Sequence, residues 1–304
     1  MNYDESQQIW LGLVLASLMF GVALELRLSH FLYVLRRPLP VFTGLLAQCL
    51  LLPWATLVAT LFLDLKPGIE LGLLLVACCP GGNMSNIMTH LARGNTALSM
   101  SMTAMSSLLA LVLLPLNFAL TSAQNPEASL YLAGHLQALH IDQASIMLNL
   151  LLLLGLPLAL GMLVGNAAPH FAERIMPWFK RFALLAFALF VIGGVLGNWQ
   201  MLAANFGLVF VIVVLHNASA IGLGWLMAKL ARQRGANLRA MVIEISMHNS
   251  GLALGLIFTQ FGGELHMALV AALWGTWHLI SGLLLLLFWR NKALLAPEDI
   301  PRVS

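Results

Sequence analysis

Glu244 is the one acidic residue placed well inside a long apolar stretch of this sequence. A charge at the centre of a membrane helix costs about 2.5–3.5 kcal/mol on insertion scales, so this carboxyl must be paired, protonated or bound to a cation. Ser99 and Thr103 are four residues apart and share one helix face, as oxygen ligands of a common ion should. Further candidate oxygens come from other apolar stretches: Gln48, Ser85 and Asn86. Such a set suits Na⁺ better than a transition metal.

Each of these polar residues also has a purely structural interpretation. The hydroxyls of Ser99 and Thr103 can bond the carbonyl four residues back in a membrane helix. Ser85 and Asn86 can cap a helix, and Gln48 can join two helices through its amide. The glutamate can be protonated and packed. Their arrangement in space decides between these interpretations and an ion site.

Histidines and cysteines supply the remaining reactive side chains. His216, His248 and His278 lie within apolar stretches, and a lone histidine there is usually a hydrogen-bonded structural residue. His248 stands out because it follows Glu244 by four residues. The three cysteines, Cys49, Cys78 and Cys79, all lie in apolar runs without a C-x-x-C spacing, so we interpret them as packing residues.

Two glycine-containing breaks interrupt the apolar stretches that carry these residues. Cys79-Pro80-Gly81-Gly82-Asn83 interrupts one, and His248-Asn249-Ser250-Gly251 interrupts the other. Paired interruptions in two halves of a membrane chain indicate a transporter site near the midplane. Half-helices beginning near Met84 and Ser250 would direct positive ends at an anion. Half-helices ending near Cys79 and Met247 would offer carbonyl oxygens to a small cation.

The composition indicates that the helices carrying these breaks lie in a membrane. The chain has 304 residues, 60% hydrophobic and 9% charged, whereas soluble domains carry about a quarter charged residues. Nine stretches are long enough to cross a bilayer, at residues 9–28, 41–63, 69–91, 97–120, 146–164, 178–197, 206–230, 238–261 and 268–289. Residues 121–145 form the only long loop of this scheme. The net charge of +3 is too small to suggest nucleic acid.

The positive charges orient the spans. With the N-terminus outside, Lys66 is the only one of 15 lysines and arginines on the outer side, and the C-terminus is cytoplasmic. The N-terminus lacks the basic segment of a secretory signal, so the first apolar stretch is a retained span. We therefore expect an all-α, multi-pass protein of a bacterial inner membrane. We expect the second to fourth and the seventh to ninth spans to form inverted repeats.

These motifs resemble the bile acid:sodium symporter family. The run Cys78-Cys79-Pro80-Gly81-Gly82, with Ser85-Asn86 and then Leu91-Ala92-Arg93-Gly94-Asn95, is similar to that family's first crossing helix. The run from Glu244 to Ala253 is similar to the second. The resemblance covers nearly the whole chain. It implies a nine-helix member with a core domain, about residues 39–121 and 204–290, and a panel domain, about residues 8–28 and 144–198.

The resemblance also implies two sodium sites and a substrate cleft. The first sodium site would use Ser85, Asn86, Ser99, Thr103 and Glu244. The second would use Gln48, Glu244, the carbonyls of Ile245 and Met247, and the side chain of residue 248. Substrate would contact Asn83, Met84, Asn249, Ser250 and His278. This chain departs from the family at His248, where glutamine is usual, and a nitrogen ligand suits Na⁺ poorly.

The expected function is sodium-coupled uptake of an organic anion, either bile-acid-like or a small carboxylate, by alternating access. Na⁺ is the coupling ion, and neither a cofactor nor an obligate protein partner is inferred beyond the lipid bilayer. Alternatives are a proton-coupled carrier, an efflux carrier for a small oxyanion or metalloid binding at Cys78 or Cys79, and a non-transporting sensor. An intramembrane enzyme is disfavoured because the sequence has no HExxH or GxSxG motif.

Overall fold

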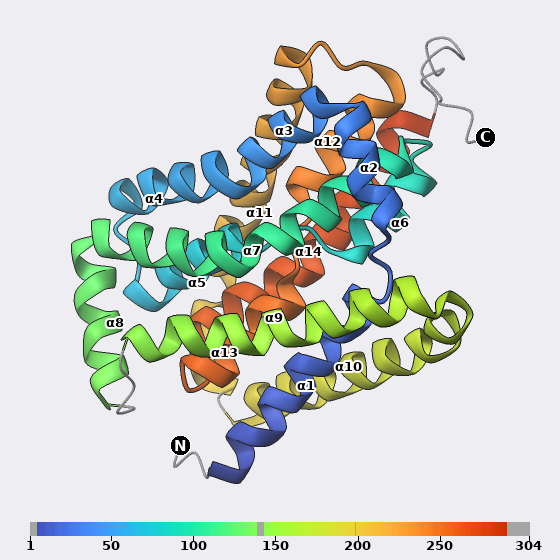
Figure 1. The fold of residues 1–304 in the computed structure, drawn as a ribbon. Helices are drawn as coiled ribbons and strands as arrows, with labels where there is room; N and C mark the ends of the chain where they lie inside the picture. Colours follow the sequence, from blue (N-terminus) through green and yellow to red (C-terminus); the bar gives the residue numbers. More distant parts are fainter. Residues whose placement is uncertain (1–4, 139–142, 198, 291–304) are drawn as a thin grey trace.

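The computed structural model describes residues 5–138, 143–197 and 199–290, and this part of the chain is built from helices without a named strand. Figure 1 shows them as one bundle. The first half contains α1 (Glu5–Ala23), α2 (Leu28–Arg36), α3 (Pro38–Leu46), the π-helix η1 (Ala47–Leu51), α4 (Leu52–Leu63), α5 (Pro67–Cys78), α6 (Asn83–Leu91) and α7 (Thr96–Gln124). The second half contains α8 (Pro126–Ala138), α9 (Gln143–Ala167), α10 (Pro169–Gly197), α11 (Trp199–Leu230), α12 (Gly235–Ser246), α13 (Ser250–Gln260) and α14 (Leu265–Arg290).

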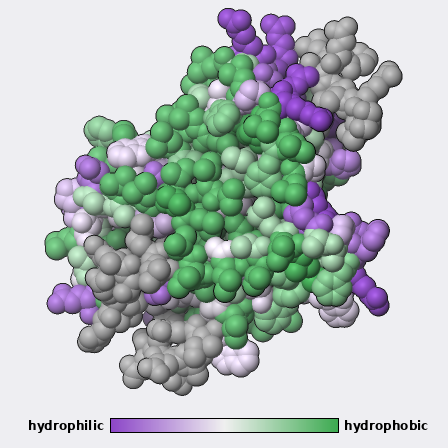
Figure 2. All heavy atoms as spheres, viewed as in Figure 1, coloured by the Kyte–Doolittle hydropathy of each residue, from purple (hydrophilic) through white to green (hydrophobic). Residues whose placement is uncertain are grey.

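The surface of this bundle is that of a multi-pass membrane protein. Among the described residues, four helices are long and apolar enough to cross a membrane, at residues 38–63, 96–124, 203–230 and 265–289. The bent pair α1 and α2 qualifies as a fifth. Figure 2 shows the viewed face covered by apolar side chains, with hydrophilic groups gathered at its margins. The all-α membrane fold is confirmed, and the count of nine spans stays a prediction.

Both predicted helix breaks are present. α5 ends at Cys78 and α6 begins at Asn83, while α12 ends at Ser246 and α13 begins at Ser250. Proline lacks the amide hydrogen that would continue α5, and glycine lowers the cost of the extended linker that follows. Each interrupted segment is therefore two short helices joined by a few extended residues.

The first predicted span ends earlier than residue 28. The chain bends by 57° between α1 and α2. Asn166 on α9 fixes this bend, because its Nδ2 donates to the carbonyl of Leu26 at 3.0 Å and its Oδ1 accepts from the amide of Leu28 at 3.0 Å. Arg27 donates to the carbonyl of Gly165 and pairs with Glu173 at 3.5 Å. The apolar stretch at residues 9–28 gave no indication of this bend.

The predicted loop at residues 121–145 was wrong over most of its described length. α7 continues to Gln124, and α8 occupies Pro126–Ala138. Asn125 allows the second helix to begin, because its Oδ1 accepts from the amide of Ala128 at 3.1 Å. Proline at the first helical position loses no bond. A polar composition was taken for a loop although an Asn-Pro helix start was present.

α1, α9 and α10 pack against one another and lie together in the lower part of Figure 1. α2, by contrast, packs on α7 in the remainder of the bundle. The bend after Ala23 thus connects the two groups of helices. The predicted panel corresponds to the first group, and the division into panel and core stays a proposal.

The α1–α9 contact depends on glycine. A Cβ atom added to Gly161 would lie 2.6 Å from Cβ of Ala23 and 2.7 Å from the carbonyl oxygen of Phe20. We expect Gly161→Ala to destabilise the protein by about 1–3 kcal/mol through overpacking, measured as a lower thermal midpoint. Gly134→Ala on α8 is the control, because nothing lies within 4 Å of its added Cβ. An unchanged midpoint for Gly161→Ala would contradict this packing argument.

Candidate functional site at the helix crossing

The two breaks meet and pair with each other. Gly81 and His248 form an isolated antiparallel β-bridge, and the amide of Asn249 donates to the carbonyl of Pro80 at 2.8 Å. These bonds satisfy backbone groups that leave the helices, as a low-dielectric membrane interior requires. The predicted crossing of the two broken helices is therefore present, and four helix ends converge on one point.

Glu244 lies at this crossing and is completely buried. Its Oε2 lies 2.7 Å from Oγ of Ser85 and 2.6 Å from Oγ of Ser99, and its Oε1 lies 2.6 Å from Oγ1 of Thr103. The amide oxygen of Asn86 lies 2.9 Å from the Ser99 hydroxyl and 3.2 Å from the Thr103 hydroxyl. The structure therefore brings together all residues of the first predicted sodium site.

This cluster contains more acceptors than protons. Ser85, Ser99 and Thr103 each have one hydroxyl proton, yet these three protons face five acceptors: both oxygens of Glu244, the amide oxygen of Asn86, and the carbonyls of Gly82 and Ser99. Within the described part of the chain, the carboxylate is bonded to hydroxyls and not to a lysine or arginine. A buried carboxylate without a counter-charge is costly, and a hard cation would supply the missing charge.

Gln48 of the second predicted site also lies at the crossing. It is fully buried, and its Nε2 donates to the carbonyl of Glu244 at 3.1 Å. Its Oε1 has no hydrogen-bond partner in the structure. An orphaned buried oxygen beside a buried carboxylate again fits a cation, because an unsatisfied acceptor is otherwise unfavourable.

His248 changes the rest of the second predicted site. Its Nδ1 lies 2.8 Å from the carbonyl oxygen of Cys79, and its Nε2 lies 3.1 Å from that of Ile245. The Ile245 carbonyl, a predicted sodium ligand, thus already has the imidazole as its neighbour. Met247 is buried at the end of α12, but no contact places its carbonyl with these groups. The structure therefore assembles the second set less completely than the first.

A cleft of about 660 Å³ opens beside the crossing, between α1 and α10 on one side and the broken helices on the other. All predicted substrate residues line it: Asn83, Met84, Asn249, Ser250 and His278. Leu18, Val22 and Phe179 supply an apolar wall. Ser85 lines the cleft and also bonds Glu244, so one side chain connects the cleft to the buried carboxylate.

Trp274 on α14 lies beside the crossing, among three histidines. It is fully buried, and the centroid of its ring lies 5.3 Å from the ring centroid of His248 and 5.4 Å from that of His278. Its Nε1 donates to Nδ1 of His216 at 2.9 Å. Nε2 of that histidine therefore carries the proton and donates to Oγ1 of Thr56 at 2.8 Å.

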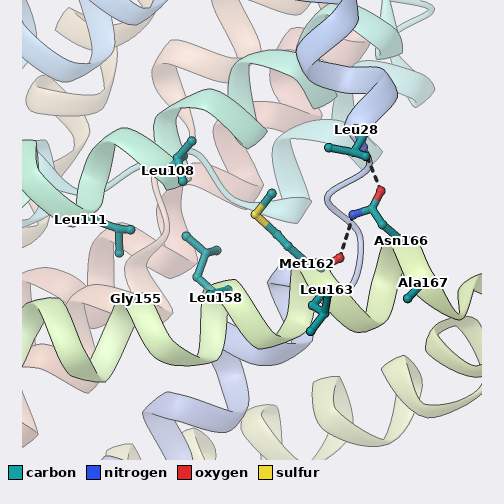
Figure 3. A pocket seen from close by; sticks show the side chains of 10 residues that line it. Leu28, Leu108, Leu111, Gly155, Leu158, Met162, Leu163, Asn166 and Ala167 are labelled. Atoms are coloured by element: carbon teal, nitrogen blue, oxygen red, sulfur yellow. Dashed lines mark hydrogen bonds between the residues drawn. The ribbon is translucent and has the colours of Figure 1, made fainter.

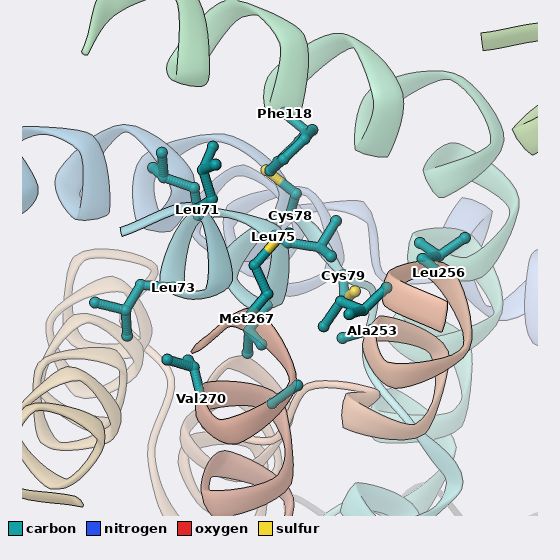
Figure 4. Packing of buried hydrophobic residues seen from close by; sticks show 14 of the residues in the cluster. Leu71, Leu73, Leu75, Cys78, Cys79, Phe118, Ala253, Leu256, Met267 and Val270 are labelled. Atoms are coloured by element: carbon teal, nitrogen blue, oxygen red, sulfur yellow. The ribbon is translucent and has the colours of Figure 1, made fainter. Parts of the chain in front are cut away.

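Two other regions lack comparable polar groups. A hollow of about 640 Å³ lies between α7 and α9, and its lining is apolar except for Asn166. Figure 3 shows Asn166 at one end of it, already bonded to Met162 and Leu28. Figure 4 shows Cys78 and Cys79 packed among leucines, Phe118 and Met267. Both cysteines are buried and neither lines the cleft, which gives the oxyanion or metalloid alternative no support.

Crossing broken helices, a buried carboxylate and an adjoining cleft define a membrane transporter rather than an enzyme. The chain belongs to the sodium bile acid symporter family, whose sequence model matches residues 12–205. It is 32% identical over 284 residues to the sodium-dependent transporter YocS of Bacillus subtilis (strain 168), covering 93% of this chain and 83% of that protein. It is 31% identical to a probable chloroplastic sodium/metabolite cotransporter, BASS2, of Oryza sativa subsp. japonica, and the match covers 97% of this chain and 68% of that protein. The human ileal sodium/bile acid cotransporter is 26% identical over 84% of this chain and 70% of its own length.

Proposed function

We propose that this protein couples entry of Na⁺ to uptake of an organic anion by alternating access. The observation that carries the proposal is the buried Glu244 carboxylate, whose neighbours offer more acceptors than protons. Na⁺ would bind there, held by Ser85, Asn86, Ser99, Thr103 and Glu244, and the unpaired Oε1 of Gln48 would be a further oxygen ligand of the same ion. The sodium-dependent relatives support this assignment of the coupling ion.

The cleft fits an anion that is largely apolar. None of the described residues that line it is a lysine or arginine. α6 begins at the cleft without a side-chain cap; the amide of Ser85 donates to the carbonyl of Gly82, which leaves those of Asn83 and Met84 for a carboxylate. The apolar wall of Leu18, Val22 and Phe179 would receive the rest of the molecule. Ser85 would couple the two sites, because sodium and substrate would both order the helix on which it lies.

We assign one sodium ion to each cycle. The imidazole nitrogens of His248 lie against the carbonyls of Cys79 and Ile245, and this leaves less room for a second ion. With a monoanion, one Na⁺ makes transport electroneutral. A second Na⁺ would make it electrogenic and would add about 2.3 kcal/mol per 100 mV.

The proposed inner-membrane topology has the basic ends of the helices in the cytoplasm. Asn95 donates to Tyr33 and Asn237, so α2 and the two loops containing Arg93 and Arg232 lie at one end of the bundle. A 340 Å³ cavity lined by Asn83, Asn86, Glu25, Arg27 and Glu173 would be the cytoplasmic mouth. The two chain termini, at residues 1–4 and 291–304, lie outside the described residues.

Sodium dependence of the purified protein tests this function. We expect the thermal midpoint to rise saturably when Na⁺ replaces choline, with a Hill coefficient near 1, because a ligand of the folded state stabilises it by RT ln(1 + [L]/Kd). Reconstituted vesicles should then take up an apolar carboxylate only when an inwardly directed Na⁺ gradient is present. No rise with Na⁺, together with a pH-dependent midpoint, would instead support the proton-coupled carrier.

A further inference from the structure

A π-turn in the second span determines where Gln48 points. η1 (Ala47–Leu51) separates α3 from α4, and the amide of Leu52 donates to the carbonyl of Ala47, five residues back. A π-turn adds one residue to the helix, which rotates the side chains before it by about 100° relative to those after it. Gln48 lies within this turn and reaches the carbonyl of Glu244.

Pro53 leaves the carbonyl of Cys49 without its ordinary helical partner, because proline has no amide hydrogen to donate four residues back. Asn117 on α7 replaces that partner: its Nδ2 donates to the Cys49 carbonyl at 2.7 Å. Asn117 is only 4% exposed, so water does not compete for this bond. A side chain from another helix thus completes the backbone next to Gln48.

Asn117 does not reach the Glu244 cluster itself. It follows Thr103 by 14 residues on α7, which at 1.5 Å per residue is about 21 Å along the helix. Its link to the Gln48 side of the site is its bond to the π-turn. The β-bridge at Gly81 leaves little freedom, since a Cβ at that position would lie 3.2 Å from Nε2 of Gln48.

We propose that Asn117 is a positioning residue of the sodium site: by bonding the carbonyl that Pro53 leaves open, it holds the π-turn that directs Gln48 to the crossing. This inference rests on the proposed function for its effect on Na⁺. Its structural part, the dependence of the π-turn on Asn117, stands independently. Loss of the amide donor lets the turn relax and moves the Gln48 oxygen away from Glu244.

The experiment uses a change that keeps the branched shape of the side chain but removes the donor, Asn117→Leu, and a compensating change, Pro53→Ala, which restores an amide hydrogen at residue 53. We expect Asn117→Leu to weaken the Kd for Na⁺, measured from the thermal midpoint, at least tenfold. The double variant should recover to within threefold of the original protein. Ser122→Ala, which removes a bond to the Ala119 carbonyl on the same helix, is the matched control and should leave the Kd unchanged.

Hydrogen exchange provides a second measurement that does not require Na⁺. Amides of residues 47–54 should exchange faster in Asn117→Leu, or in Asn117→Ala if the first variant is recovered poorly, and return to the original rate with Pro53→Ala. Unchanged exchange and Na⁺ affinity would overturn the inference. Weakened affinity without recovery in the double variant would also overturn it, because the effect would then not pass through the Cys49 carbonyl. A parent protein without any Na⁺ response would instead overturn the proposed function.

Discussion

Glu244→Gln is expected to remove the Na⁺-dependent rise in thermal midpoint and to lower Na⁺-driven uptake at least a hundredfold. Glutamine keeps the shape of the side chain and an acceptor for the hydroxyls, so the fold should persist. It lacks the negative charge that would balance the ion in a fully buried site. A hundredfold loss of ion affinity corresponds to about 2.7 kcal/mol, well within the cost of removing one partner of a buried charge pair.

Glu70→Gln is the matched control for this change. Glu70 is also a buried glutamate, 2% exposed, and its carboxylate accepts from Asn125 at 2.8 Å and from the amide of Leu65 at 3.2 Å. Its neighbours supply donors in place of a cation, so we expect the Na⁺ response to remain. If Glu244→Gln keeps the full Na⁺-dependent rise, the ion does not bind at this carboxylate.

The crossing could be predicted from the sequence because its signals are local. Pro80, Gly81 and Gly82 interrupt one apolar stretch, and Asn249 to Gly251 interrupt another. Glu244 was equally visible because an acidic residue is rare in a membrane helix. Hydroxyls four residues apart, at Ser99 and Thr103, required only helical periodicity. The structure brings all of these together.

The remaining features depend on contacts between distant helices. The π-turn at Ala47–Leu51 contains no glycine and differs from an α-helix by one residue in register. The chain of Thr56, His216 and Trp274 joins α4, α11 and α14, and no spacing along the sequence relates these three residues. α8 was missed for a different reason, since a polar helix outside the apolar stretches has the composition of a loop.

Gly81→Ala is expected to abolish Na⁺-driven uptake and to weaken Na⁺ binding more than tenfold. A Cβ at this position would overlap Oε1 of Glu244 and would lie 3.2 Å from Nε2 of Gln48. Both groups are fully buried, and the backbone of Gly81 is fixed by its bridge to His248. The methyl group must therefore displace the carboxylate or separate the crossing, at about 1–3 kcal/mol of strain. Uptake and the Na⁺ titration of the thermal midpoint measure the two effects.

Gly82→Ala separates this effect from a general intolerance of the linker. The Cβ of residue 82 would lie 3.6 Å from Cα and Cβ of Asn249, which is ordinary van der Waals contact. Gly82 borders the cleft, so its variant should alter the affinity for the anion while Na⁺ binding persists. Equal loss of Na⁺ binding in the two variants would indicate that the linker conformation matters, and not the space beside Glu244. A selective loss in Gly81→Ala places the ion next to the carboxylate, because only that methyl group competes for the same volume.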